Sequence, residues 1–338
     1  MRFVLAVRVV TGCLLAALAG QGLAQEESPT TRLQSLRDKI AQRVQARVQG
    51  RTAPGLAISG PGDYSLSVDH GGRQRLYRVH VPSSYSARQP MALVLSLHGG
   101  GGHMDYQAND AYYGQISKSE QAGFIAVFPN GHSRLPGGKL ATWNAGNCCG
   151  SARDDGVDDV GFIRALLERL HTQLNIDRKR VFANGMSNGG MMAYRLACEA
   201  PDLFMAIASV AGTDNTSACT PSRPISVLHI HARDDDMVLF NGGAGRGRAA
   251  VTDFVSVPAT VSKWVGLNGC HATPKRVLEA SGATCDLYAP CRGGVEVQLC
   301  VTDTGGHSWP GGSKVRGGAP GSTALSATDV IAEFYANH

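Results

Sequence analysis

Runs of hydrophobic residues alternate with amphipathic segments along the chain from about residue 64 onward. Residues 92–97 and 124–128 are almost continuously apolar, which is the pattern of strands buried on both faces of a sheet. Apolar residues recur every three or four positions within 160–174, which predicts an amphipathic helix with Asp158 and Asp159 at its N-terminal end. Similar patterns predict further strands at 76–81, 181–183, 206–211, 225–230 and 295–301, and further helices at 191–200, 259–267 and 328–336.

Buried strands separated by helices are typical of a mainly parallel sheet with helices on both faces. No linker rich in serine, threonine or proline interrupts the pattern, and no internal repeat is present. We therefore predict a single α/β domain over residues 61–338.

The first 24 residues have the composition of a secretory signal peptide. Arg2 and Arg8 form a basic start, residues 13–18 are apolar, and small residues end the segment at Ala24. Residues 10–13 also resemble a lipobox, which would make Cys13 a lipid anchor. The apolar run continues past Cys13, so we favour a cleaved leader and a secreted or periplasmic protein.

Residues 25–60 are interpreted as a basic amphipathic arm. Within this polar, arginine-rich segment, apolar residues lie three or four positions apart and predict a helix that ends near Gly50. One interpretation is an arm that tethers the protein to a surface. The alternative is a helix that packs on the domain or acts as a spacer.

The excess positive charge of the chain lies in these N-terminal segments. Of the 338 residues 43% are hydrophobic, a fraction too high for a disordered chain. The formal net charge is +5. The leader and residues 25–52 account for all of the excess positive charge, which leaves the remainder neutral. A neutral domain argues against a nucleic-acid partner.

The cysteine count indicates an oxidising compartment. Eight of the nine cysteines follow the leader, and an even number in a secreted chain predicts up to four disulfides. Closeness along the sequence suggests the pairs Cys148–Cys149, Cys198–Cys219, Cys285–Cys291 and Cys270–Cys300.

The strongest chemical motif is Gly185-Met186-Ser187-Asn188-Gly189, which stands between a predicted strand and a predicted helix. The pattern G-x-S-x-G in that context is the nucleophile elbow of α/β-hydrolases, a tight turn that exposes a serine hydroxyl above the sheet. We therefore predict that Ser187 is a nucleophile.

A serine nucleophile needs a base and an orienting acid, which this fold supplies in the order Ser, Asp, His. Asp235 follows the predicted strand 225–230, and His307 follows the last predicted strand in a loop rich in glycine. From position alone, Asp234 and Asp236 are equally good candidates for the acid.

Backbone donors for an oxyanion are predicted in the glycine run that follows His98. Glycine lets the chain approach a carbonyl oxygen that gains charge during the reaction. We assign one donor to the backbone N–H of Gly100 and the other to that of Asn188, the residue after the nucleophile.

With these motifs in view, residues 75–335 resemble secreted esterases of the polyhydroxybutyrate-depolymerase type. This group includes many feruloyl and acetylxylan esterases of carbohydrate esterase family one. The resemblance implies an α/β-hydrolase fold and selects Asp235 as the acid, although the family pattern H-G-T-x-D departs here at Ala232 and Arg233. It rests on residues 97–100, 128–131, 143–146, 157–162, 185–190 and 305–312.

We therefore predict a serine esterase that acts on hydroxycinnamoyl or acetyl esters of plant polysaccharide and requires no metal or organic cofactor. The alternatives are a hydrolase of polyhydroxybutyrate or its oligomers, and a non-catalytic envelope lipoprotein on the same scaffold. Trp143 and Trp309 stand in loops expected at the active-site edge, so we predict that they line the substrate pocket.

Two groups of metal-ligating residue types are given structural roles instead. The acidic residues between 154 and 159 have the composition of a calcium site, but helix capping and ion pairing explain them better. His229 and His231 alternate on a strand as two zinc ligands do, but no third ligand stands at a suitable spacing. No metal site is predicted.

Overall fold

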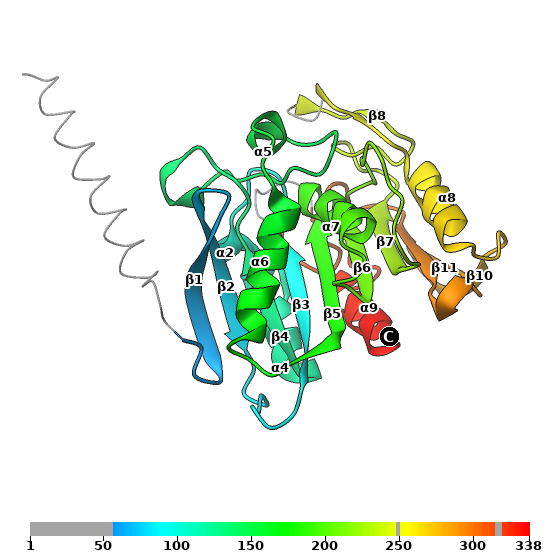
Figure 1. Ribbon diagram of the computed structural model, residues 1–338. Helices are drawn as coiled ribbons and strands as arrows, with labels where there is room; N and C mark the ends of the chain where they lie inside the picture. The colour runs from blue at the N-terminus through cyan, green and yellow to red at the C-terminus, as the bar shows by residue number, and fades with distance from the viewer. Residues whose placement is uncertain (1–56, 248–250, 315–319) are drawn as a thin grey trace, which may run out of the picture. The chain divides into compact units, whose positions relative to one another are not determined.

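The hydrophobic runs form the strands of a ten-stranded sheet in the computed structural model of the protein, which describes residues 57–247, 251–314 and 320–338 (Figure 1). The described residues all belong to one compact unit. The predicted signal peptide, Cys13 and nearly all of the arm at 25–60 lie outside the described residues.

The sheet is mainly parallel, as predicted, with antiparallel strands at both edges. Its central strands β4, β3, β5, β6, β7 and β12 run parallel to one another, whereas β1, β2, β10 and β11 pair antiparallel. In spatial order the strands are β1 (Gly62–His70), β2 (Arg73–Val81), β4 (Phe124–Pro129), β3 (Met91–Leu97), β5 (Ile176–Met186), β6 (Ala206–Val210), β7 (Ser226–Ala232), β12 (Val297–Thr302), β11 (Ala283–Tyr288) and β10 (Lys275–Ala280). A separate two-stranded sheet joins β8 (Gly243–Ala244) to β9 (Asp253–Phe254).

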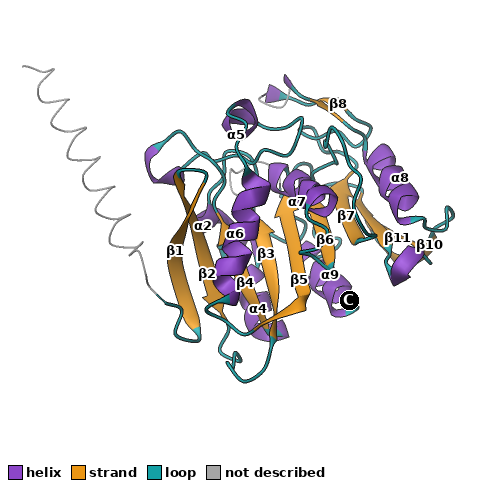
Figure 2. Cartoon of the chain, in the orientation of Figure 1, coloured by secondary structure: helices purple, strands orange, loops and turns teal. Residues whose placement is uncertain are grey.

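Helices cover both faces of the sheet (Figure 2). The helices α6, α7 and α8 pack on one face, and α4 and α9 pack on the other. The described helices are α2 (Met104–Gln107), α3 (Asp110–Tyr113), α4 (Gln115–Ala122), α5 (Gly150–Asp154), α6 (Asp159–His171), α7 (Asn188–Glu199), α8 (Val257–Asn268) and α9 (Ala327–Ala336), with short 3₁₀ turns at Pro136–Gly138 and Arg292–Gly294.

The two-sided cover explains why the central strands are continuously apolar. Leu93 and Leu95 of β3 join the core beneath α6 and α7, whereas Ala92 and Val94 of the same strand join the core beneath α9. Successive side chains of a strand point to opposite faces, so a strand buried on both sides needs an apolar residue at every position.

The edge strands β1 and β10, and β11 next to β10, were not predicted from the sequence. β10 illustrates the reason, because five of its six residues are exposed and only Leu278 is partly buried. An edge strand of this kind lacks the regular apolar period on which strand prediction depends. It is held instead by its backbone pairing with β11.

Four disulfides are present among the described residues. The predicted pairs Cys148–Cys149 and Cys198–Cys219 are formed, but the other two predicted pairs are wrong. Cys285 bonds Cys300, and Cys270 bonds Cys291. Cys285 and Cys300 stand directly opposite each other on the antiparallel strands β11 and β12. Cross-strand pairing therefore determines the partner of Cys285, and the shorter separation along the chain misled the prediction.

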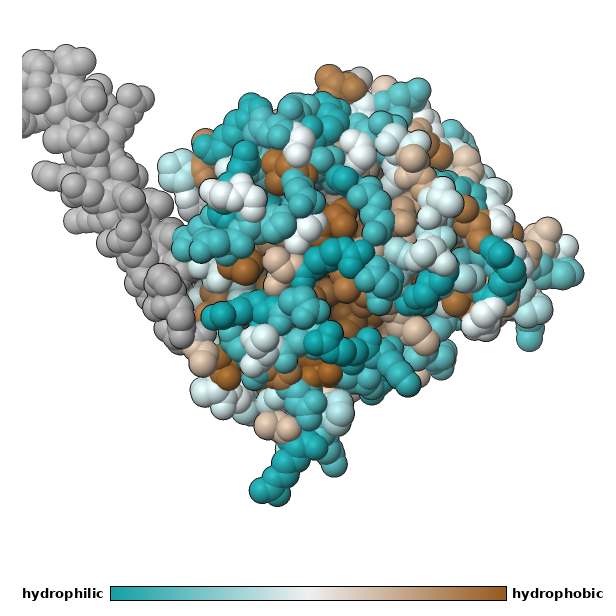
Figure 3. Space-filling view, in the orientation of Figure 1, coloured by the Kyte–Doolittle hydropathy of each residue, from teal (hydrophilic) through white to brown (hydrophobic). Residues whose placement is uncertain are grey.

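On the face shown in Figure 3, hydrophilic side chains predominate and apolar ones are scattered between them. Of the described helices, none has both the length and the apolar character that a membrane crossing requires.

The parallel topology brings the loops that carry the predicted chemistry to one edge of the sheet. β3 ends before the glycine run at 99–102, β5 before Ser187, β7 before Asp235 and β12 before His307. Carboxyl ends of parallel strands meet at a common edge, and residues far apart in the sequence become neighbours there.

Candidate active site

Ser187 occupies the tight turn between β5 and α7, with φ 55° and ψ −122°. A non-glycine residue in this conformation is strained and persists only where the surrounding structure enforces it. The crowding supplies that constraint, because a Cβ on Gly189 would lie 2.2 Å from the carbonyl oxygen of Leu97, and a Cβ on Gly185 would lie 2.4 Å from the carbonyl carbon of Gly189. The geometry is that of a nucleophile elbow.

The acid loop after β7 presents Asp235 to His307. Oδ2 of Asp235 accepts a hydrogen bond of 2.8 Å from Nδ1 of His307. Oδ1 accepts hydrogen bonds of 2.9 Å from the backbone N–H groups of Met237 and Val238. Both oxygens of this buried carboxylate are therefore engaged, and its orientation is determined from both sides.

The two neighbouring acids have other partners. Asp234 accepts hydrogen bonds from the backbone N–H groups of Gly305 and Gly306, which belong to the loop that carries His307. Asp236 is exposed, with Arg246 at 4.0 Å. The structure thus brings Asp235, and not its neighbours, into contact with the histidine.

Asp235 carries its negative charge at neutral pH. Burial by itself raises its pKa, but hydrogen bonds from His231 and His307 outweigh burial and hold the pKa well below its usual range. An ionised Asp235 keeps the proton of the His307 imidazole on Nδ1. Nε2 of His307 then has a free lone pair and can act as a base.

Ser187 and His307 line the same cavity, which has a volume of about 820 Å³. Trp309 also lines it, as predicted, and its ring contacts that of Tyr113 edge to face at 5.3 Å. Its indole N–H donates to Oγ1 of Thr328 at 2.9 Å. The structure therefore joins the predicted base, nucleophile and one predicted pocket tryptophan in one cavity.

Trp143 does not line this cavity, so the prediction for it is wrong. Its side chain is fully buried, and its indole N–H donates to the carbonyl oxygen of His98 at 3.0 Å. Its backbone exchanges two hydrogen bonds with the side-chain amide of Asn188. The loop does reach the active-site edge as expected, but Trp143 turns inward and supports the glycine run from below.

Several cavity residues were missed in the sequence. Tyr106 and Tyr113 come from α2 and α3, which are too short to show a helical period. Met186 and Met237 flank the predicted nucleophile and acid, and adjacency to those motifs was the signal available for them.

The glycine run lies against the elbow, where an oxyanion hole is expected. A Cβ on Gly99 would lie 3.5 Å from Cβ of Ser187, and a Cβ on Gly100 would lie 3.5 Å from Cβ of Asn188. Asn188 is the first residue of α7, and such an N–H has no partner within the helix. Gly100 and Asn188 are thus adjacent and next to the serine, as the assignment of both donors requires.

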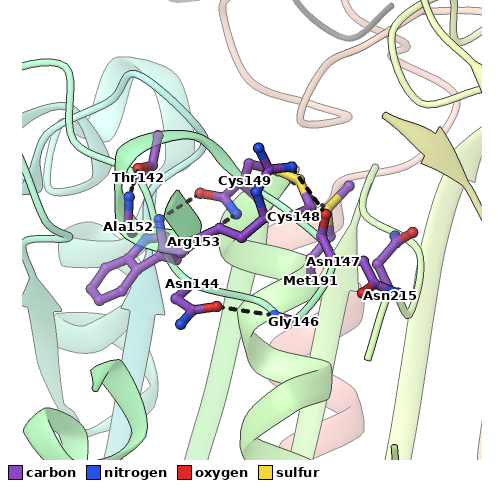
Figure 4. The surroundings of a disulfide bond; sticks show 12 residues. Thr142, Asn144, Gly146, Asn147, Cys148, Cys149, Ala152, Arg153, Met191 and Asn215 are labelled. Atoms are coloured by element: carbon purple, nitrogen blue, oxygen red, sulfur yellow. Dashed lines mark hydrogen bonds between the residues drawn. A yellow bond between two sulfur atoms is a disulfide. The ribbon is translucent and has the colours of Figure 1, made fainter. Parts of the chain in front are cut away.

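The Cys148–Cys149 disulfide lies close to the start of α7, which carries Asn188. Figure 4 shows Cys148 and Cys149 beside Met191 of α7, and Sγ of Cys149 lies 4.0 Å from Sδ of Met191. The backbone N–H of Cys149 donates to the carbonyl of Trp143. This carbonyl also accepts from the side chain of Asn188, so the disulfide loop supports the residue next to the nucleophile.

The acidic residues at the start of α6 serve as capping and pairing groups. Asp158 caps α6 by accepting from the backbone N–H of Gly161 at 2.8 Å. Asp159 is buried with Arg75 at 2.6 Å, and it also accepts from the backbone N–H of Asn144. Burial raises the pKa of Asp159, and Arg75 opposes that effect. The motif thereby ties the loop that follows Trp143 to the sheet.

His98 supports the glycine run as a neutral group. Its Nε2 accepts from the backbone N–H of Gly131 at 2.9 Å, so its proton is on Nδ1, which donates to the carbonyl of Gly99 at 2.8 Å. Burial lowers the pKa of His98 to about 4. The unfolded chain protonates this histidine below about pH 6.5, so it binds more protons than the folded protein between about pH 4 and pH 6.5.

The free energy of unfolding should therefore decrease as the pH falls through this window. We predict that His98 alone lowers the free energy of unfolding by about 2 kcal/mol between pH 7.5 and pH 5. Glutamine does not take up a proton in this range, so His98→Gln should lose this part of the pH dependence. Urea unfolding at both pH values measures it, with the exposed His271→Gln as the matched control. Equal pH dependence in His98→Gln and the parent protein would contradict the prediction.

Comparison with known proteins agrees with the fold and with the motifs. The model of the esterase family, described as "Putative esterase", matches residues 70–251, and the chain belongs to this family. This membership confirms the esterase resemblance, and the parallel sheet with helices on both faces confirms the predicted α/β-hydrolase fold.

Two relatives and one solved structure illustrate the similarity. Feruloyl esterase B of Piromyces equi is 28% identical over 68% of this chain, and the match spans 42% of the length of that protein. An esterase from Nocardia uniformis subsp. tsuyamanensis, named "Putative esterase NocK", is 30% identical over 78% of this chain and 79% of its own length. Acetyl xylan esterase from Aspergillus awamori has the same fold, with a TM-score of 0.53 at 15% identity over 78% of this chain and 94% of that one.

Proposed function

We propose that the protein is a serine esterase that hydrolyses carboxylic esters through an acyl-enzyme. The observation that carries this proposal is the 2.8 Å hydrogen bond between buried Asp235 and His307, at the wall of the cavity into which Ser187 opens. Membership of the esterase family supports it.

In the first step Ser187 attacks the ester carbonyl while Nε2 of His307 takes its proton. Asp235 holds the imidazole in the required tautomer and stabilises the imidazolium that forms. The backbone N–H groups of Gly100 and Asn188 donate to the oxyanion of the tetrahedral intermediate. Each such donor is worth about 3 kcal/mol of transition-state stabilisation, and the N-terminus of α7 adds the positive end of its dipole.

In the second step the alcohol leaves with the proton that His307 took from the serine. Water then attacks the acyl-enzyme while His307 takes a proton from it. His307 passes that proton to Oγ of Ser187, which leaves as the free acid forms. The chain's own side chains and backbone donors carry every step of this sequence.

The substrates we propose are hydroxycinnamoyl or acetyl esters of plant polysaccharide. Feruloyl esterase B of Piromyces equi, named for the first of these activities, supports the proposal. The cavity supports it as well, since its volume of about 820 Å³ lies within the usual range for small-molecule sites. Three aromatic side chains, Tyr106, Tyr113 and Trp309, line it beside Met186 and Met237 and offer an apolar wall for an aryl group.

Oligomers of hydroxybutyrate are the alternative substrates, because the sequence also resembles polyhydroxybutyrate depolymerases. We predict that kcat/KM for methyl ferulate exceeds that for hydroxybutyrate oligomers by at least about 10-fold, since the aromatic wall buries an aryl group that the oligomers lack. Initial rates of ferulate and hydroxybutyrate release measure the ratio, and a preference for the oligomers would reverse the order of the two proposals.

Tyr106 offers a variant for the same experiment. It is half exposed at the cavity, and Tyr106→Ala should lower kcat/KM for methyl ferulate more than for nitrophenyl acetate, whose acyl group is small. If the protein hydrolyses none of methyl ferulate, nitrophenyl acetate and the hydroxybutyrate oligomers, the result would favour a non-catalytic envelope lipoprotein on the same scaffold.

We also propose that the mature protein is secreted or periplasmic. Four disulfides among the described residues support this location, because such bonds persist in oxidising compartments. Tethering through the basic arm or through a lipid on Cys13 is a further proposal about residues that lie outside the described ranges.

A further inference from the structure

A line of buried polar side chains leads through the interior of the fold to Asp235. His229 and His231 lie two residues apart on β7, and their rings stack with centroids 5.2 Å apart. Tyr194 of α7 lies at the far end of the line, and all three side chains are buried. The catalytic steps derived above use none of them.

The hydrogen bonds along the line determine the proton positions. Nε2 of His231 lies 2.8 Å from the carbonyl oxygen of Val238, which only accepts, so this nitrogen carries the proton. Nδ1 of His231 therefore accepts, and its donor is Nε2–H of His229 at 3.0 Å. Nδ1 of His229 in turn accepts from the hydroxyl of Tyr194 at 2.8 Å. Every donor thus points toward the acid loop.

The last donor of the line reaches the acid itself. Nε2 of His231, besides its bond to Val238, lies 3.4 Å from Oδ2 of Asp235, the oxygen that accepts from His307. Val238 also donates its own N–H to Oδ1 of Asp235. His231 therefore holds both the acid loop and the catalytic carboxylate, and the opposite tautomer would set a lone pair against that carboxylate.

We propose that His231 is a positioning residue for the triad, kept in its donor tautomer by His229 and Tyr194. The inference rests on the proposed serine esterase function and deepens it. By sharing Oδ2 with His307, the N–H of His231 fixes the direction of the carboxylate and takes up part of its charge.

The surroundings of the line favour a neutral His229 and a protonated Tyr194. Burial, and next the neighbouring His231, keep the pKa of His229 well below its usual value. Burial, together with the charge of Asp214, raises the pKa of Tyr194 well above its usual value. Asp214 is itself paired with Lys263 at 2.8 Å.

Among the described residues, Phe240 and His307 also face His231. The ring of Phe240 meets His231 edge to face at 6.1 Å, and His307 faces it across Asp235. The titratable groups that face the line are therefore Asp235, His307 and Asp214.

The test compares two substitutions at the same position. His231→Gln keeps an N–H donor near the place of Nε2, whereas His231→Leu removes it. We expect His231→Leu to lower kcat for nitrophenyl acetate by about 10- to 100-fold with KM nearly unchanged, because a displaced carboxylate misdirects His307. The acidic limb of the profile of kcat/KM against pH should move to higher pH, because Asp235 then holds the proton of His307 more strongly. His231→Gln should restore most of kcat and the position of the limb, even if its unfolding temperature falls.

Tyr194→Phe keeps the experiment informative if His231→Leu does not fold, because it removes a single oxygen atom. It frees the tautomer of His229, and we expect a several-fold lower kcat with the acidic limb displaced in the same direction. Unchanged kcat and an unchanged limb in His231→Leu and Tyr194→Phe, with only a lower unfolding temperature, would overturn the proposal and leave the line a purely structural one. Ser187→Ala measured in parallel distinguishes failure of the His231 proposal from failure of the proposed function. Activity retained in Ser187→Ala would refute the serine esterase function itself.

Discussion

Replacing Ser187 with alanine is expected to lower kcat for a soluble ester by about 10⁵- to 10⁶-fold, because the covalent route is then closed. The change removes one oxygen from a residue whose backbone is held by the elbow, and the backbone N–H of Ser187 keeps its 2.8 Å bond to the carbonyl of Val210. Folding should therefore be preserved. Steady-state kinetics with nitrophenyl acetate, together with circular dichroism and the unfolding temperature, check both parts.

Ser308 provides the matched control for this variant. Its hydroxyl belongs to a residue that lines the same cavity, but it donates to the carbonyl oxygen of Gly305 at 2.9 Å. Ser308→Ala removes the same oxygen atom from the same cavity and should cost orders of magnitude less. Similar losses in the two variants would contradict the assignment of Ser187 as nucleophile.

Replacing Asp235 with asparagine is expected to lower kcat by about 10⁴-fold, and the structure supplies the reason. The N–H groups of Met237 and Val238 both donate to Oδ1. An asparagine must therefore place its own oxygen there and turn its NH₂ group toward His307. Nδ1 of His307 then has to accept, its proton moves to Nε2, and the histidine can no longer take the proton of the serine.

Asp303→Asn is the matched control, since it makes the same chemical change at an exposed acid near the end of β12. Asp303 is paired only loosely with Arg233, at 3.6 Å, and its substitution should change kcat by less than about threefold. The comparison is made on kcat near neutral pH, with the unfolding temperature as a check on folding. A loss in Asp235→Asn no larger than that in Asp303→Asn would show that another acid orients His307.

Much of the fold could be predicted because the central strands are buried on both faces. Such strands must be apolar at every position, so β3 and β4 can be recognised in the sequence as continuous hydrophobic runs. The outer strands β10 and β11 are held mainly by backbone pairing and by the Cys285–Cys300 bond, and neither leaves a local pattern. The same absence of a local signal explains the two wrong disulfide pairs.

The residues of the candidate site also divide into those that the sequence predicts and those that it does not. The elbow at Ser187 and the histidine loop at His307 were recognised because each depends on residue types within a few positions of one another. Trp143 and Tyr106 show the limit of this approach. Both stand in loops at the active-site edge, but Trp143 turns inward to bond His98, whereas Tyr106 opens into the cavity. The direction of a loop side chain depends on partners far away in the sequence.

By itself the sequence predicted the class of fold, the candidate nucleophile Ser187 and the candidate base His307, and it located the excess positive charge in the N-terminal segments. It did so because periodicity, glycine at crowded turns and motif spacing are local consequences of chain geometry. Only the tertiary structure decided, without appeal to a resemblance, that Asp235 and not Asp234 or Asp236 meets His307. Only the tertiary structure brought Tyr194 and the two histidines of β7 into line behind that carboxylate. Hydrogen bonds between groups tens of residues apart form only after the sheet has assembled, and no local pattern records them.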